Sequence, residues 1–158
     1  MALTGLILGY IGIAFIPVIL IIAAIAIPNL LRAKMAANEA SAVGTLRVYN
    51  SAMVTYAGAC PKTGFPARLE NLGPGAGDCE RAGMVNGALA GPQPTKSGYT
   101  FQYEVAQRND AGQAWTYTLN ADPVTQGTTG VRHFFTDQTG VIRWKLGAEA
   151  DAGSAPLQ

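Results

Sequence analysis

Charge is absent from the start of this sequence. Residues 1–31 contain no Asp, Glu, Lys, Arg or His, so all eleven basic and all ten acidic residues lie in the remaining 127. As a helix rising about 1.5 Å per residue, this segment would extend about 46 Å, against a hydrocarbon core of about 30 Å. It is therefore long enough to cross a membrane. A cleaved secretory signal would carry basic residues ahead of its apolar run; none precede this one, so we expect the segment to be retained.

Cysteine and histidine are scarce as well. Cys60 and Cys79 are the only cysteines, and His133 is the only histidine. A metal site of the usual composition requires more ligands than these. In an exported domain the two cysteines favour one disulfide, which would close a loop of about 20 residues and stabilise the fold by about 3 kcal/mol. The alternative is a pair of buried free thiols in a cytoplasmic domain.

The first charges after the apolar segment bear on its orientation. Arg32 and Lys34 follow it closely, and the positive-inside rule would place them on the cytoplasmic side. A disulfide-bonded domain would instead lie on the periplasmic or extracellular side. The two expectations agree if a basic leader precedes Met1, so that Met1 is the mature N-terminus.

No motif for catalysis or for a bound cofactor is found. His133 lies in a strand-like run, and Asp110 and Asp137 lie in turn sequences, where Asp favours local hydrogen bonds. A catalytic nucleophile would need a base within reach and an orienting group. We therefore expect no enzyme: no catalytic residue, no cofactor and no metal site. A net charge of +1 gives no support for nucleic-acid binding. The low share of charged residues favours a surface covered by other subunits or by glycans.

After Pro28 the apolar pattern becomes periodic. The apolar positions are Met35, Ala42, Leu46, Tyr49, Met53 and Tyr56. Their spacings of three, four and seven residues describe one face of a helix, expected over roughly residues 29–57. Because proline lacks an amide hydrogen, we expect the helix to be interrupted near Pro28. Gly58 and Pro61 provide its end.

Strand signals follow a loop that is rich in Gly and Pro. Apolar and polar residues alternate over residues 99–105 and 115–120, and further strand-like runs cover residues 131–136 and 141–146. Turn sequences, "RNDAG" and "DQTG", join these runs in pairs. The pattern predicts an α+β fold, in which the amphipathic half of a long apolar helix packs on a four-stranded antiparallel sheet.

The chain divides into five expected segments. The apolar helix covers residues 1–31 and its amphipathic continuation covers residues 32–57. A loop that contains both cysteines covers residues 58–97, the sheet covers residues 98–147, and an irregular tail covers residues 148–158.

The helical stretch "AAIAIPNLLRAKMAANEASAVGTLR", residues 23–47, resembles the N-terminal helix of type IV pilins and of the related pseudopilins of type II secretion. Two further stretches agree with this resemblance. "GFPARLENLG" resembles the loop after the pilin helix, and "HFFTDQTGVIRW" resembles the terminal hairpin of many small bacterial pilins. The helical stretch is the most specific of the three.

The resemblance implies a ladle-shaped pilin subunit that packs its apolar helix into the core of a helical filament. Such a subunit is inserted in the inner membrane and is then drawn into an extracellular homopolymer by pilus assembly machinery. A minor pilin or a type II secretion pseudopilin is the first alternative. The second is a membrane-anchored periplasmic binding domain that does not polymerise.

The apolar segment departs from the pilin pattern in two ways. Pilins usually carry a glutamate close behind the mature N-terminus, whereas this chain has Thr4 and Gly5 there, and counting back from Pro28 leads to Ile11. The second departure is a proline within the apolar half, which neighbouring helices in a filament core could accommodate. Small residues would also let helices approach closely. The positions expected to matter for packing in the filament core are Gly5, Gly9, Gly12, Pro17 and Pro28.

Overall fold

The computed structural model describes residues 2–110 and 112–157, and the side chains of residues 15–17, 19–110 and 112–157. The chain forms two compact units, residues 1–34 (unit 1) and residues 35–158 (unit 2). One helix, α1 (Ala2–Ala59), provides all described residues of unit 1 and the first 25 residues of unit 2. The coarse prediction of an α+β fold with a long N-terminal apolar helix is confirmed.

Helix α1 continues through both of its prolines, Pro17 and Pro28. The predicted interruption near Pro28 is therefore wrong. A proline removes a single amide donor from the helix, so Ala24 loses the hydrogen bond that residue 28 would donate, while neighbouring residues still form theirs. The helix ends after Ala59, where the Cys60 amide still donates to the Tyr56 carbonyl at 2.8 Å.

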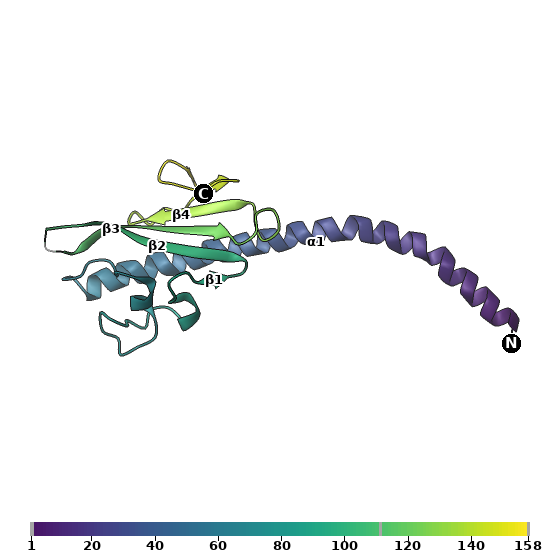
Figure 1. Cartoon of the computed structure of the whole chain (residues 1–158), viewed down its shortest axis with the longest axis horizontal. Helices are drawn as coiled ribbons and strands as arrows, with labels where there is room; N and C mark the ends of the chain where they lie inside the picture. The colour runs from purple at the N-terminus through teal and green to yellow at the C-terminus, as the bar shows by residue number, and fades with distance from the viewer. Residues whose placement is uncertain (1, 111, 158) are drawn as a thin grey trace. The chain divides into compact units, whose positions relative to one another are not determined.

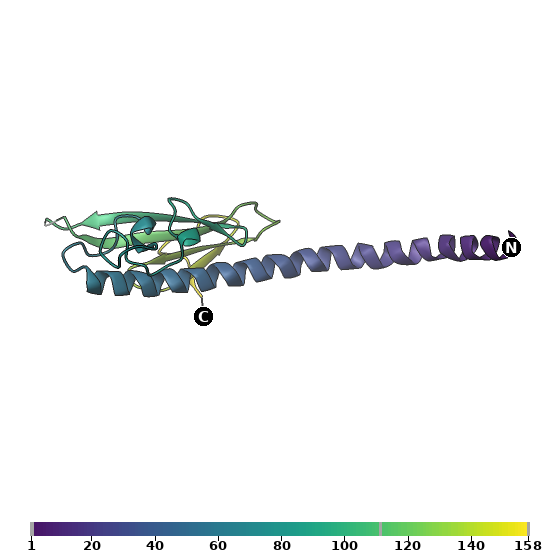
Figure 2. The same ribbon diagram turned by 90° about the horizontal axis from the view of Figure 1, so that it is seen from below.

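Unit 2 is built around the predicted stripe of α1. Ala42, Leu46, Tyr49, Met53 and Tyr56 are all at most 1% exposed, whereas Met35 is half-buried. These side chains pack against apolar residues on the inner face of the sheet, including Tyr99, Phe101, Leu119 and Phe134. Figures 1 and 2 show the sheet running along this half of the helix.

The sheet has six antiparallel strands, each paired with the next strand in sequence. Their bounds are β1 (Thr95–Lys96), β2 (Tyr99–Arg108), β3 (Ala114–Pro123), β4 (Arg132–Asp137), β5 (Arg143–Leu146) and β6 (Ala155–Pro156). The prediction of four strands found β2 to β5 and missed the two edge strands. Both β1 and β6 contain two residues, which is too short for an alternating pattern to be recognised.

Two glycines, Gly98 and Gly130, occupy positions in or beside the sheet that disfavour a side chain. The turn between β1 and β2 is Ser97–Gly98, and both residues have positive φ, as a two-residue hairpin of type I′ requires. Gly130, just before β4, lies directly against the Tyr99 ring, so a Cβ atom there would overlap that ring.

Two short 3₁₀ helices also pack against the apolar stripe of α1. They are η1 (Leu69–Leu72) and η2 (Gly87–Leu89). Leu69, Leu72 and Leu89 are buried in the same core as the helix stripe. The Tyr49 hydroxyl donates to the Leu89 carbonyl at 2.6 Å, so η2 is held by a polar as well as an apolar contact.

A buried carboxylate joins α1 to the sheet. Glu39 is 4% exposed and accepts three hydrogen bonds: from the Val131 amide at 2.9 Å, the Arg132 amide at 3.2 Å and the Arg132 Nε at 2.7 Å. A buried charge is stable only when it is paired and hydrogen-bonded in this way. Glu39 also lies in register with the apolar stripe, between Met35 and Ala42.

We predict that Glu39→Ala lowers the free energy of unfolding by about 3 kcal/mol, because it leaves two amides and a guanidinium without their acceptor. Denaturant unfolding of the full chain in detergent micelles, followed by tryptophan fluorescence, measures this loss. Glu104→Ala provides the control, since Glu104 is exposed and its loss should change stability by less than about 0.5 kcal/mol. Equal losses for the two variants would show that the Glu39 contacts do not stabilise unit 2.

Candidate interaction surface and disulfide loop

The described side chains of unit 1 form an apolar surface without a core. The large apolar residues are Phe15, Ile16, Ile19, Leu20, Ile21, Ile22, Ile25, Ile27, Leu30 and Leu31, and each is 39–72% exposed. They point in all directions around the helix, so no single face is preferred. A helix that is apolar all round requires apolar surroundings on every side.

Helix α1 is long and apolar enough to cross a membrane, by length and composition. This finding supports the prediction of a membrane-spanning segment near the N-terminus. Its extracellular filament destination stays a prediction.

The residues predicted to pack in a filament core all lie on α1. Gly5, Gly9 and Gly12 belong to the helix, but their surroundings fall outside the described side chains, and Met1 lies outside the described residues altogether. Pro17 and Pro28 are exposed. Positions 5 and 9 are one helical repeat apart and so share a face of α1.

In unit 2 the outer face of α1 carries a single charge. Its exposed residues are Ala36, Ala37, Ala40, Gly44, Arg47, Val48, Ser51, Val54, Thr55, Gly58 and Ala59. Apart from Arg47, none is larger than valine. A Cβ atom added at Gly44 or Gly58 would meet nothing within 4 Å. Small side chains of this kind allow another helix to approach closely.

Two shallow hollows flank this outer face. Met84 lines one of them together with Val48 and Thr55, and Leu157 lines the other together with Val141 and the stem of Arg47. The first hollow is mostly apolar, whereas the second combines polar and apolar surface. The face is therefore bordered by Met84 of the loop at one hollow and by Val141 and Leu157 at the other.

Cys60 and Cys79 form the predicted disulfide, with their Cα atoms 5.9 Å apart. The alternative of two free thiols is wrong. Cys60 follows the last residue of α1 and is 5% exposed, whereas Cys79 lies in an exposed loop. The bond therefore fastens the middle of that loop to the end of the helix.

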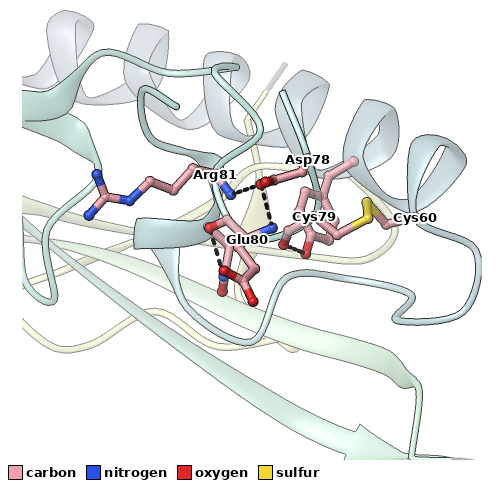
Figure 3. Close-up of a disulfide and its surroundings, with 7 residues drawn as sticks. Cys60, Asp78, Cys79, Glu80 and Arg81 are labelled. Carbon is pink, nitrogen blue, oxygen red and sulfur yellow. Dashed lines mark hydrogen bonds between the residues drawn. A yellow bond between two sulfur atoms is a disulfide. The ribbon is translucent and has the colours of Figure 1, made fainter. Parts of the chain in front are cut away.

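Hydrogen bonds hold the loop on both sides of Cys79. The Tyr56 hydroxyl donates to the Cys79 carbonyl at 2.5 Å, and burial, with a smaller contribution from Asp78, raises the pKa of Tyr56. Figure 3 shows the Asp78 carboxylate accepting from the Glu80 and Arg81 amides, at 3.0 and 2.8 Å. The disulfide thus anchors a loop that has its own internal order.

His133 and Asp137 are engaged in contacts within the sheet and its turns, and Asp110 is exposed. His133 lies in β4, where its Nδ1 is 2.6 Å from the Asp122 carboxylate. Asp137 accepts from the amide and the hydroxyl of Thr139 in the following turn. Among the described residues, no three His, Cys, Asp or Glu side chains are grouped closely enough to hold a metal ion.

Sequence reasoning missed two of the contacts that define unit 2. Glu39 could have been recognised, because an acidic residue within an apolar stripe indicates a buried, paired carboxylate. The contact of His133 with Asp122 had no local signal, because it depends on how β3 and β4 pair.

Comparison of this chain with family models, with curated proteins and with solved structures finds no match. The resemblance to pilins therefore rests on the residues quoted from the sequence.

We predict that the double substitution Cys60→Ser and Cys79→Ser lowers the free energy of unfolding by about 3 kcal/mol, because it releases the constraint on the unfolded chain. The loop should also become more accessible to trypsin at Lys62 and Arg68. Limited proteolysis with mass spectrometry measures the cleavage rate at each site. Cleavage after Lys145, an exposed residue of β5 that pairs with His133 of β4, should not change and serves as the internal control. An unchanged rate at Lys62 and Arg68 would contradict the anchoring role of the disulfide.

Proposed function

We propose that this chain is the structural subunit of a type IV pilus-like filament and polymerises through its N-terminal helix. The observation that carries the proposal is the exposed apolar surface of unit 1, from Phe15 to Leu31. At about 1.5–3 kcal/mol for each large apolar side chain, exposing these residues to water would cost more than the stability of an ordinary domain. Lipid or other copies of the chain must cover them.

The outer face of α1 in unit 2 supports covering by other copies. It consists of small residues, with Arg47 as its one exposed charge. A helix that only anchored unit 2 to lipid would gain nothing from keeping this face small and almost uncharged. A heterologous contact repeated along an axis produces an open filament, and two stretches of one helix supply surface for such a contact.

The proposed route begins in the bacterial inner membrane, with α1 inserted as a span. Pilus assembly machinery, made of separate proteins, would then transfer the subunit into the extracellular filament. Transfer of an apolar helix from lipid to a bundle of similar helices gains little hydrophobic free energy. Packing of the helices, contacts between the second units and the machinery itself would drive assembly.

A minor pilin or a type II secretion pseudopilin is the alternative within the same class. It is favoured by the missing glutamate. A subunit present in few copies need not reproduce, at every position of the filament, the helix placement that this glutamate would set. No enzymatic activity is proposed for either subunit.

A membrane-anchored periplasmic binding domain is the alternative from a different class. One observation favours it: Trp115, 63% exposed, lines a small hollow with Phe65 and Pro61. An exposed tryptophan beside apolar walls could bind a ligand. In this case α1 would stay in lipid and the chain would not polymerise.

Electron microscopy of sheared cell-surface material, with the chain identified by mass spectrometry and by immunogold labelling, tests the proposal. We expect the chain as the main component of thin filaments. A minor subunit would be present at a small fraction of the filament protein. Recovery of the chain only as a monomer in membranes would refute polymerisation and favour the binding domain.

We further predict that Arg47→Glu reduces the filament yield at least tenfold without changing the amount of chain in the membrane. The substitution reverses the one exposed charge on a face proposed to pack between subunits, so an acceptor that a neighbouring copy offers to Arg47 would instead meet a like charge. Lys62→Glu, with the same charge change at an exposed loop position, is the matched control and should retain most of the yield. Similar yields for Arg47→Glu and the wild type would exclude this face of α1 from the filament contact.

A further inference from the structure

His133 has an unusual pair of partners. Its Nδ1 is 2.6 Å from Asp122 Oδ1, and its Nε2 is 3.1 Å from Gln126 Oε1. The side chains of His133 and Asp122 are 14% and 18% exposed. Both ring nitrogens therefore face an oxygen atom, in a position that is partly shielded from water.

The orientation of the Gln126 amide is fixed by a second contact. Its Nε2 donates to the Val131 carbonyl at 3.1 Å, so its Oε1 is the atom that faces the histidine. Turning the amide over would bring its oxygen against the Val131 carbonyl, which is also an acceptor. Gln126 can therefore only accept a hydrogen bond from His133.

These partners determine how many protons the ring carries when both bonds are made. The Asp122 carboxylate accepts a hydrogen bond, and so does Gln126 Oε1, so both ring nitrogens must donate. A neutral imidazole has one donor and one acceptor, whereas the imidazolium has two donors. Only the protonated ring satisfies both contacts at once.

Two further charged side chains, those of Lys145 and Arg132, lie near His133 in the sheet. Lys145 is its cross-strand neighbour in β5, and its ammonium lies 3.8 Å from Asp151. Arg132, the preceding residue, directs its guanidinium to Glu39. Asp122 is the charged group in direct contact with the ring, at 2.6 Å.

Gln126 belongs to a loop that fastens β3 and β4 to α1. Within the loop, the Gly127 amide donates to the Gly130 carbonyl at 2.8 Å. The Thr129 carbonyl accepts from Asn38 Nδ2 at 2.9 Å, and the Val131 amide donates to the buried carboxylate of Glu39. The loop of residues 124–131 therefore connects the histidine to the first turns of α1 in unit 2.

We propose that His133 is a proton-dependent latch on the loop of residues 124–131. The protonated ring bridges Asp122 and Gln126 and closes the latch. When the ring loses a proton, it keeps the bond to the stronger acceptor, the Asp122 carboxylate, and the bond to Gln126 is lost. The loop is then held less firmly, and with it the contact of Thr129 with Asn38. The latch is closed while the ring is protonated and open once the ring is neutral.

The latch does not depend on polymerisation, so it can be tested on the subunit alone and can fail independently of the proposed function. Because His133 is the only histidine, its ring signals need no further assignment. The experiment is a pH titration of the full, isotopically labelled chain in detergent micelles by NMR, from pH 5 to pH 9. It follows the two ring nitrogens, the Gln126 side-chain amide and the backbone amides of Gly127 and Gly130.

We expect both ring nitrogens to be protonated at pH 5, and the loop amides to shift with the same midpoint as the ring. The amide of Gly140, in the turn after β4, should not follow that midpoint and serves as the internal control. A ring that is neutral at pH 5 would overturn the proposal. So would a ring that titrates while the loop amides remain unchanged.

Two variants separate the latch from a general loosening of the loop. Lys145→Gln removes the neighbouring cation without touching the loop, and the loop amides should still follow the ring. Gln126→Met removes the acceptor, so the ring should still titrate while Gly127 and Gly130 no longer follow it. Loop signals that keep following the ring in Gln126→Met would show that the coupling runs through another contact.

Discussion

One apolar stripe on α1 organises unit 2. Leu46, Tyr49 and Met53 lie on it at helical spacing, and all three are fully buried. The inner face of the sheet and both 3₁₀ helices pack against the same stripe. Because the stripe follows one face of the helix, only one rotation of α1 about its axis turns the stripe toward the inner face of the sheet. Polar contacts from Glu39 and Tyr49 then fix the helix along its length, and burial raises the pKa of the Tyr49 hydroxyl.

The same helix loses this directional character in unit 1. Between Phe15 and Leu31 the large apolar side chains are spread around the axis, so the sequence specifies an apolar environment rather than a particular partner. Within unit 2 the outer face is instead lined with small residues. The two stretches of α1 thus differ in what they demand: one requires apolar surroundings, and the other permits close approach without requiring it.

The sequence predicted those parts of the fold that repeat locally. The alternation over residues 99–105 predicted β2, and the helical spacing over residues 42–56 predicted the buried stripe. Both predictions succeeded because each pattern is contained within one element. The pairing of Cys60 with Cys79 followed from there being only two cysteines. The edge strands were missed because two residues carry no period, and the effect of Pro28 was overestimated because one lost hydrogen bond is a small part of a long helix. The surroundings of His133 could not be predicted, because strand register brings Asp122 to it and the folding of the connecting loop, residues 124–131, brings Gln126.

The shortness of β1 has a consequence for the behaviour of the sheet. It pairs with Tyr99 and Thr100 of β2, the Phe101 amide donates to Pro94 just before it, and the rest of the ten-residue strand extends past β1. An open strand edge is a template on which other chains can add as further strands, the route to amyloid. Here β2 has irregular register from Val105 to Arg108, with Glu104 and Arg108 exposed beside it, and both a bulge and charged side chains obstruct strand addition. The apolar helix thus favours association with other apolar surfaces, whereas the edge of the sheet opposes the addition of further strands. Self-association would then proceed through the helix and not through the sheet.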